Sequence, residues 1–209
     1  TGAYPAAMRC LPSMKNSKFT HVSVPLDASL SSEQLSSYDL VHISFCGDLS
    51  YASILPNPLP HRNHKQLVSY PAYCSGWYWA PEVKVIINHY DSSTYTIDQM
   101  YVHSFSQRPA YPYDHMQQKL FSMRTTPPLR SMTSEAVMMW QSIAKGTANS
   151  LYGRCAQRIG WDEEKKEAPK SHQLEWAGWT TSCVRAQMLE LMILIGKKNL
   201  ISIETDGVI

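Results

Sequence analysis

The chain has 209 residues, enough for one domain or for a domain with a subdomain, and a formal net charge of +2. So small a charge permits an anionic partner but does not by itself mark a nucleic-acid module. The five cysteines lack metal-ligand spacing, so we expect neither a zinc site nor a disulfide framework, and we expect no membrane span and no secretory signal.

The first half of the chain alternates between short regular segments and loops. The small and apolar residues of 1–19 predict a short helix, in which Pro5 favours an extended or turn conformation for Tyr4. Apolar residues at 41, 43 and 45 alternate as they do in a half-buried strand. Residues 50–73 are crowded with Pro, Asn, His and Tyr, which predicts a long connection or an inserted subdomain.

The middle of the chain predicts two helices and a strand. Ala80-Pro81-Glu82 is typical of a helix start, and that helix is expected to reach about Asn88 and to precede a strand over 95–105. Asp114 is a candidate cap for a helix through about Met123. Strands and helices joined by long connections indicate an α+β fold.

Two longer helices are predicted toward the end. The apolar stripe of the first, capped by Ser131 or Thr133, consists of Val137, Trp140, Ala144, Ala148 and Leu151. The stripe of the second, capped by Thr180 or Thr181 and ended by Gly196, consists of Val184, Met188, Leu191 and Ile195.

The first of these helices carries polar residues beside its stripe. Lys145, Asn149 and Tyr152 stand at i, i+4 and i+7 and therefore share one face. A cation, an amide and an aromatic ring on one face suit a nucleoside triphosphate. The alternative is a solvated face with a partly buried tyrosine, which is the commoner situation for an arbitrary amphipathic helix.

The last ten residues predict a hairpin with Asp206 and Gly207 in its turn. A carboxylate at a hairpin tip is a rigid mount for a divalent cation with oxygen ligands, although Asp-Gly turns are also common without any function.

The order of these features resembles family B DNA polymerases. Lys145-Gly-Thr-Ala-Asn-Ser-Leu-Tyr-Gly153 fills every defining position of their motif B, Lys-x3-Asn-Ser-x-Tyr-Gly. Ile203-Glu-Thr-Asp-Gly-Val208 is similar to motif C, and Gly2-Ala-Tyr-Pro5 to the end of motif A. Gly76–Val83 and Trp179–Arg185 resemble further segments of viral and organellar members, so the resemblance covers essentially the whole chain.

The resemblance implies residue roles. Lys145 contacts the triphosphate as a catalytic residue, Asn149 and Tyr152 shape the nucleotide pocket, and Tyr4 lies under the deoxyribose. Asp206 is the catalytic metal ligand for two Mg²⁺ ions, with Mn²⁺ as a substitute, and Glu204 acts indirectly or through water. Arg130 is a candidate with less support for a second phosphate contact, and Gly153 is one for DNA. Apart from the resemblance, the small basic cluster of His61, Arg62, His64 and Lys65 makes Arg62 and Lys65 candidate contacts to DNA phosphates, and the alternative of a solvated loop is the commoner situation.

The resemblance also implies an organisation. The fold expected is a polymerase palm, an antiparallel sheet with packed helices, plus helical fingers, incomplete at both ends. Residues 1–49 form the first part of the palm, 50–115 an inserted subdomain and palm return, 116–178 the fingers, and 179–209 the palm helix and motif C hairpin. An insertion within 50–115 is the feature that suggests priming by a protein.

The function expected is that of a DNA-directed DNA polymerase from a viral, phage or plasmid system. Its partners are template and primer DNA, dNTPs and a terminal protein, and no membrane. Its location is the cytoplasm or the host compartment of such a genome, including mitochondrion or nucleus. Because the motif A aspartate would precede Thr1, this piece alone is expected to be inactive. The alternatives are an inactive polymerase-derived nucleic-acid-binding protein and an unrelated α+β interaction domain.

Overall fold

The chain divides into two compact units. A helical unit comprises Thr1–Lys15 and Arg108–Val184, and a sheet unit comprises Asn16–Gln107 and Arg185–Ile209. The computed structural model describes residues 3–13, 17–25, 29–47, 58–62, 68–108, 110–126, 131–157, 162–164, 166–167, 172–196 and 199, and the backbone of 203–204 and 207–208.

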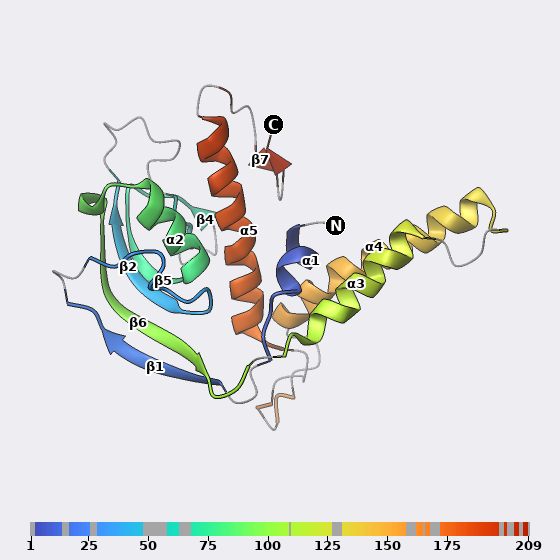
Figure 1. Ribbon diagram of the computed structural model, residues 1–209, viewed down its shortest axis with the longest axis horizontal. Helices are drawn as coiled ribbons and strands as arrows, with labels where there is room; N and C mark the ends of the chain where they lie inside the picture. The colour runs from blue at the N-terminus through green and yellow to red at the C-terminus, as the bar shows by residue number, and fades with distance from the viewer. Residues whose placement is uncertain are drawn as a thin grey trace. The chain divides into compact units, whose positions relative to one another are not determined.

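The sheet unit is built on four antiparallel strands in the order β1-β6-β2-β5 (Figure 1). Their bounds are β1 Ser17–Ser23, β2 Leu40–Cys46, β5 Tyr73–Trp79 and β6 Tyr95–Phe105, with a 3-10 turn, η1, at Ser92–Thr94. Strand β2 buries Val41, Ile43 and Phe45 as its alternation predicts, and β6 spans the predicted residues. Because side chains alternate across a strand, one face of the sheet is available for a core.

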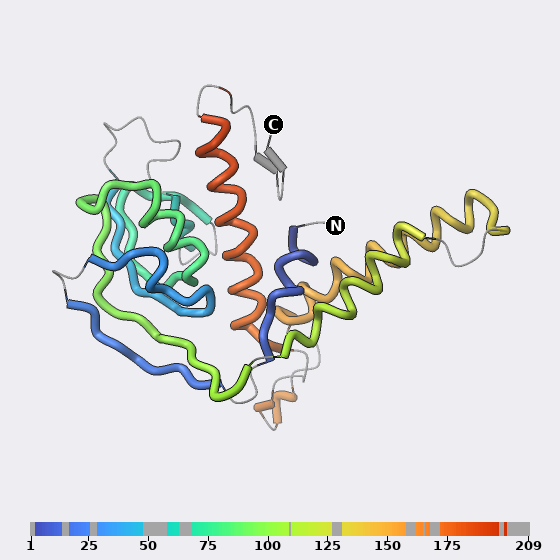
Figure 2. Tube along the Cα trace, in the orientation of Figure 1, coloured from blue at the N-terminus to red at the C-terminus, as the bar shows by residue number. Residues whose placement is uncertain are grey.

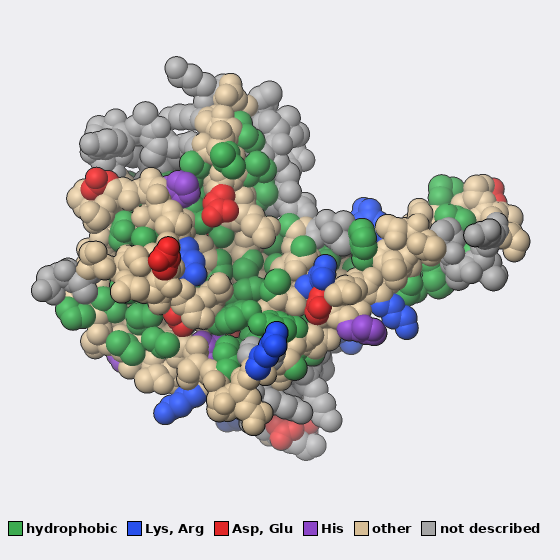
Figure 3. All heavy atoms as spheres, in the orientation of Figure 1, with side chains coloured by type: hydrophobic (Ala, Val, Ile, Leu, Met, Phe, Trp, Pro, Cys, Tyr) green, Lys and Arg blue, Asp and Glu red, His purple; other side chains and the backbone are tan. Residues whose placement is uncertain are grey.

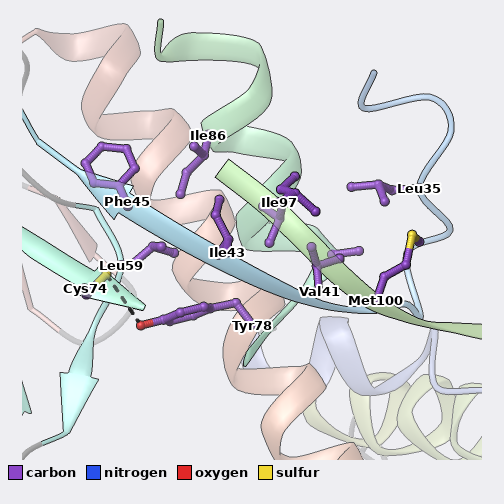
Figure 4. Close-up of a cluster of buried hydrophobic side chains, with 12 residues drawn as sticks. Leu35, Val41, Ile43, Phe45, Leu59, Cys74, Tyr78, Ile86, Ile97 and Met100 are labelled. Atoms are coloured by element: carbon purple, nitrogen blue, oxygen red, sulfur yellow. Dashed lines mark hydrogen bonds between the residues drawn. The ribbon is translucent and has the colours of Figure 1, made fainter. Parts of the chain in front are cut away.

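Helix α2 (Ala80–His89) packs on strands β2 and β5. It begins at Ala80 with a proline in its first turn and ends one residue beyond the predicted position. Its Val83 and Ile86 are fully buried and join the apolar face of the sheet. Figure 4 shows this core, in which the Tyr78 hydroxyl donates to the Sγ of Cys74 at 3.8 Å.

An ion pair between a buried carboxylate and a partly exposed guanidinium joins α2 to the second half of helix α5 (Leu174–Ile195) within the sheet unit. Arg185 Nε and an Nη atom donate to the two oxygens of Glu82, at 2.6 and 2.8 Å. The Glu82 side chain is only 4 % exposed. Beside this pair, Val85 of α2 packs with Ala186, Leu189 and Met192.

Two small hairpins complete the sheet unit. β3 (His61–Arg62) pairs with β4 (Val68–Ser69), and β7 (Ile203–Glu204) pairs with β8 (Gly207–Val208). Glu204 stands opposite Gly207, so Gly207 belongs to a strand and not to the turn that the Asp-Gly dipeptide predicts. Because Glu204 pairs with Gly207, only positions 205 and 206 separate the two strands, and two residues are enough to join antiparallel strands.

The helical unit consists of α1 (Ala3–Met8), α3 (Pro112–Thr125), α4 (Ser134–Ala156) and the first half of α5. Figure 2 traces α3 and α4 side by side, and α1 packs against both. Tyr4 is helical here rather than extended, because first-turn residues need no intrahelical donor and Pro5 is tolerated there. Helix α3 likewise starts at Pro112, two residues before the predicted cap Asp114.

Helix α5 begins earlier than its predicted caps. It starts at Leu174, so Thr180 and Thr181 lie inside it, and the Thr181 hydroxyl donates to the Ala177 carbonyl at 2.8 Å. A threonine that bonds back to the preceding turn does not need a capping position. The apolar stripe is also shifted, since Ala186, Leu189 and Met192 are buried while Leu191 is 41 % exposed. The end is as predicted, with Gly196 at φ +77°.

The fold is thus α+β, with an antiparallel sheet and packed helices, as expected. On the face drawn in Figure 3, basic and acidic side chains are interspersed rather than gathered into one patch. None of the helices among the described residues combines the length and the apolar character that a membrane span requires.

Candidate nucleotide site

Helix α4 presents the motif B residues on its open side. Thr133 caps the helix by accepting from the Ala136 N–H at 3.3 Å, as predicted. Ala144 is buried in the predicted stripe, and Lys145 and Asn149 are exposed. The Trp140 indole N–H donates to the Met123 carbonyl of α3 at 2.7 Å, which fixes one helix along the other.

Tyr152 of α4 meets Tyr4 of α1. Their ring centroids are 4.8 Å apart and the rings are tilted by 38°. A tilted pair at this distance is favourable beyond its buried area. The residue assigned to the end of motif A and the last aromatic of motif B, far apart in sequence, therefore form one aromatic surface.

A buried glutamine holds α1, α3 and α4 together under this surface. Gln117 of α3 is 3 % exposed, and its Nε2 lies 3.4 Å from the Ala148 carbonyl and 3.9 Å from Met8 Sδ. A buried amide with partners on two other helices restrains their spacing. At the end of α1, Arg9 pairs with Asp114 of α3 at 2.7 Å and lowers the pKa of that carboxyl.

The tyrosine pair is also restrained from α5. Tyr152 Oη lies 2.7 Å from Thr181 Oγ1. Since Thr181 gives its own proton to the Ala177 carbonyl, Tyr152 is the donor in this bond. The chain of contacts from Ala177 through Thr181 and Tyr152 to Tyr4 sets the orientation of both rings.

A pocket opens where α1, α3 and α4 converge. Its lining brings Lys145 and Asn149 together with a second cation, Arg124 of α3. The remaining lining residues are Pro5, Gln117, Leu120, Phe121, Ala144 and Ala148. Two cations and an amide beside apolar side chains are a chemically suitable surface for a phosphorylated ligand.

Gly153 and Gly146 lie on α4 without a packing reason to be glycine. A Cβ added at either position would meet nothing within 4 Å. Glycine inside a helix costs roughly 1 kcal/mol relative to alanine, so its presence at both positions calls for another explanation. Room for a bound molecule along the helix is one, and a DNA contact at Gly153 stays a prediction.

The other predicted site residues are not assembled by the described structure. Arg62 lies in β3, exposed and opposite Val68. The backbone of Glu204 lies in β7, but its side chain is not described, and Asp206, Arg130 and Lys65 lie outside the described residues. Within the part of the chain that the structure describes, no three His, Cys, Asp or Glu side chains gather to hold a metal ion.

Three residues emerge from the structure rather than from the motifs. Gln117 and Arg124 lie on α3, whose sequence carries no distinctive pattern, so their role depends on how α3 packs. Thr181 lies in a segment that the resemblance covered, but its bond to Tyr152 has no signal in the sequence.

The chain thus combines a unit built on a four-stranded antiparallel sheet with a unit of packed helices. No protein-family model matches the chain, and no curated protein matches it. Among solved structures it is similar to Phi29 DNA polymerase complexed with primer-template DNA and incoming nucleotide substrates, with a TM-score of 0.57 over 100 % of this chain at 15 % identity. The binary complex of the same polymerase with primer-template DNA gives a TM-score of 0.57 over 99 % of this chain at 16 % identity.

At this identity the likeness shows the fold. The chain spans 37 % and 36 % of the length of these two structures, so it matches a little over a third of that polymerase.

Proposed function

We propose that the chain is the palm and fingers part of a family B DNA polymerase of the protein-primed kind. The observation that carries the proposal is the contact between Tyr4 and Tyr152, because it joins the ends of two motifs that were recognised independently in the sequence. The complete motif B on α4 and the likeness to Phi29 DNA polymerase over the whole chain support it. Protein priming follows from the sequence resemblance alone.

The proposed reaction adds a deoxynucleotide to a primer 3′ end. The 3′ oxygen attacks the α-phosphorus of a dNTP, the bond to the β-phosphate oxygen breaks, and pyrophosphate leaves. In such a transfer the protein chiefly positions the reactants and stabilises charge.

In this reaction α4 binds the nucleotide. Lys145 neutralises phosphate oxygens as a flexible point charge, and Arg124 adds a second cation from α3. Tyr152 packs against the nucleotide, and Tyr4 beneath the sugar discriminates against a 2′ hydroxyl. Asn149 contributes an amide to the pocket that Lys145 and Arg124 line, whereas Tyr4 and Tyr152 are not among its lining residues. Gly153 and the weaker candidates Arg62, Lys65 and Arg130 contact DNA or phosphate.

The donor set of the motif C hairpin fits a hard divalent cation. Glu204 and Asp206 offer carboxylate oxygens, which Mg²⁺ prefers, and Glu204 belongs to a paired strand next to the tip. Asp206 would hold the metal and Glu204 would act through water. When bound, two Mg²⁺ or Mn²⁺ ions supply activation of the attacking oxygen and stabilisation of the leaving oxygen.

Primer extension by the polymerase that contains this chain tests the proposal. Template-dependent extension should be abolished by Asp206→Ala and retained by Glu190→Ala, an exposed acidic residue of α5. Extension that is indifferent to Asp206→Ala would overturn the metal assignment. DNA binding without extension in the folded protein would instead favour a polymerase-derived nucleic-acid-binding protein.

A further inference from the structure

The open face of the sheet unit carries a second group of chemically linked side chains. His42 lies on β2, Ser75 on β5 and Asp98 on β6, and β2 is hydrogen-bonded between the other two strands. The register of β2 and β6 shifts between His42 and Ile43, so Asp98 is the extra residue of a β-bulge. A bulge re-aims the side chain that it carries, and here it brings the Asp98 carboxylate to His42.

The distances among these side chains define roles for the two imidazole nitrogens. Asp98 Oδ1 lies 2.6 Å from His42 Nδ1, so that nitrogen carries the proton and donates it to the carboxylate. The lone pair of Nε2 is thereby left for the Ser75 hydroxyl, whose Oγ is 3.5 Å away. The bond from His42 lowers the pKa of Asp98, which is therefore charged at neutral pH.

The serine is accessible and stands beside an aromatic surface. Ser75 is exposed, and Trp77 follows two residues later on the same face of β5. The Trp77 ring is 5.2 Å from His42 and 5.1 Å from Tyr101, and 40 % of Trp77 and 36 % of Tyr101 remain exposed. Ser44 Oγ supports the group from β2, 2.9 Å from Ser75 Oγ.

We propose that Ser75 is a nucleophile activated by His42 and oriented through Asp98, and that it accepts acyl groups from esters with an aromatic acyl part. A nucleophile, a base within hydrogen-bond reach and a third group that orients the base are the elements of this chemistry. The exposed rings of Trp77 and Tyr101 supply the apolar surface for the acyl part. The site lies wholly within the sheet unit and does not depend on the proposed polymerase function.

The proposed acyl transfer needs only the ester and water. Ser75 Oγ attacks the ester carbonyl carbon while its proton passes to His42 Nε2. The bond from that carbon to the alcohol oxygen breaks, and the leaving oxygen takes the proton from His42. Water, deprotonated by the same imidazole, then releases the acid and restores the hydroxyl of Ser75.

An aryl fluorophosphonate reacts at the same oxygen with loss of fluoride and reports the nucleophile directly. With the 209-residue chain, mass spectrometry should place the label on Ser75, and no label should appear there in Ser75→Ala. His42→Ala and Asp98→Asn should each slow labelling at least tenfold, and Asp98→Glu should recover part of the rate. Ser122→Ala, which removes an exposed hydroxyl on α3, should change nothing.

A hydrogen-bond network with only a structural role gives the opposite pattern. Labelling of Ser75 no faster than that of Ser122, or unaffected by His42→Ala, would overturn the proposal. Melting curves of the variants distinguish an activated serine from a purely structural network. Slower labelling supports activation of Ser75 only in a variant whose melting temperature is unchanged. Loss of labelling that tracks loss of folding in every variant would also contradict it.

Discussion

Tyr152 donates a hydrogen bond to Thr181, with 2.7 Å between the two hydroxyl oxygens, and the same tyrosine packs on Tyr4. The bond ties motif B on α4 to α5, and it orients a ring that we assign to the nucleotide pocket. The hydroxyl of Thr181 is the acceptor because its proton is already engaged by the Ala177 carbonyl.

Thr181→Val removes the acceptor while keeping the shape of the side chain. We expect it to lower the free energy of unfolding by about 1 kcal/mol, and Tyr152→Phe to do the same. Both changes break the bond between Tyr152 and Thr181, and Thr181→Val also removes the bond from Thr181 to the Ala177 carbonyl, so the double variant should lose little more than Thr181→Val alone. Urea denaturation of the four proteins measures the coupling, and simple additivity would show that the bond contributes nothing.

Glu82→Gln should destabilise the sheet unit because it removes the charge that Arg185 faces across α2 and α5. We expect the free energy of unfolding to fall by about 1–3 kcal/mol, because the carboxylate is buried while its partner Arg185 is partly exposed. Glu190→Gln, on an exposed position of α5, is the control and should be nearly neutral. Equal effects of the two changes in thermal denaturation would show that the pair is not a stabilising contact.

The sheet unit should lose stability in alkali. Burial raises the pKa of Tyr90 to about 12 from 10.0, and burial and the neighbouring Cys74 raise that of Tyr78 as well. A raised pKa in the folded state means that the stabilisation is complete below pH 10 and is lost as the pH rises through 12. Unfolding free energies at pH 9–12 should fall by an amount on the order of 2 kcal/mol for Tyr90.

Tyr90→Phe should flatten this decline, because it removes the proton that the folded state retains. The same substitution at Tyr70, which is 49 % exposed, is the control and should leave the decline unchanged. An identical alkaline decline in Tyr90→Phe and in the unaltered protein would assign the loss to other groups.

Gly146→Ala and Gly153→Ala should each stabilise α4, since an added Cβ meets nothing within 4 Å at either position. The expected gain is roughly 0.5–1 kcal/mol per substitution. If Gly153 leaves room for DNA, Gly153→Ala should also weaken DNA binding. Denaturation and fluorescence anisotropy with a primer-template distinguish the two effects, and a stabilised variant with undiminished DNA affinity would remove Gly153 from the interface.

Patterns within a few neighbouring residues were enough to predict some strands and helix starts. The alternation at Val41, Ile43 and Phe45 predicted β2, and the proline after Ala80 predicted the start of α2. The predicted start of α5 was wrong. Threonine is a common helix cap, but Thr181 lies inside the helix, where its hydroxyl donates to the Ala177 carbonyl of the preceding turn.

The candidate site divides in the same way. Lys145, Asn149 and Tyr152 share a helix face, so their spacing could be read directly. The packing of Tyr4 on Tyr152, the buried Gln117 and the approach of Arg124 depend on contacts between distant segments. The bulge that brings Asp98 to His42 is equally invisible, because it arises from the pairing register of two strands.

The most direct test of the central claim is the Michaelis constant for the incoming dNTP in primer extension by the protein that we propose to be a polymerase. Lys145→Ala should raise that constant at least tenfold, and Lys119→Ala, an exposed cation of α3 that does not line the pocket, should leave it unchanged. Equal Michaelis constants in Lys145→Ala and Lys119→Ala would contradict the assignment of α4 as the nucleotide-binding helix.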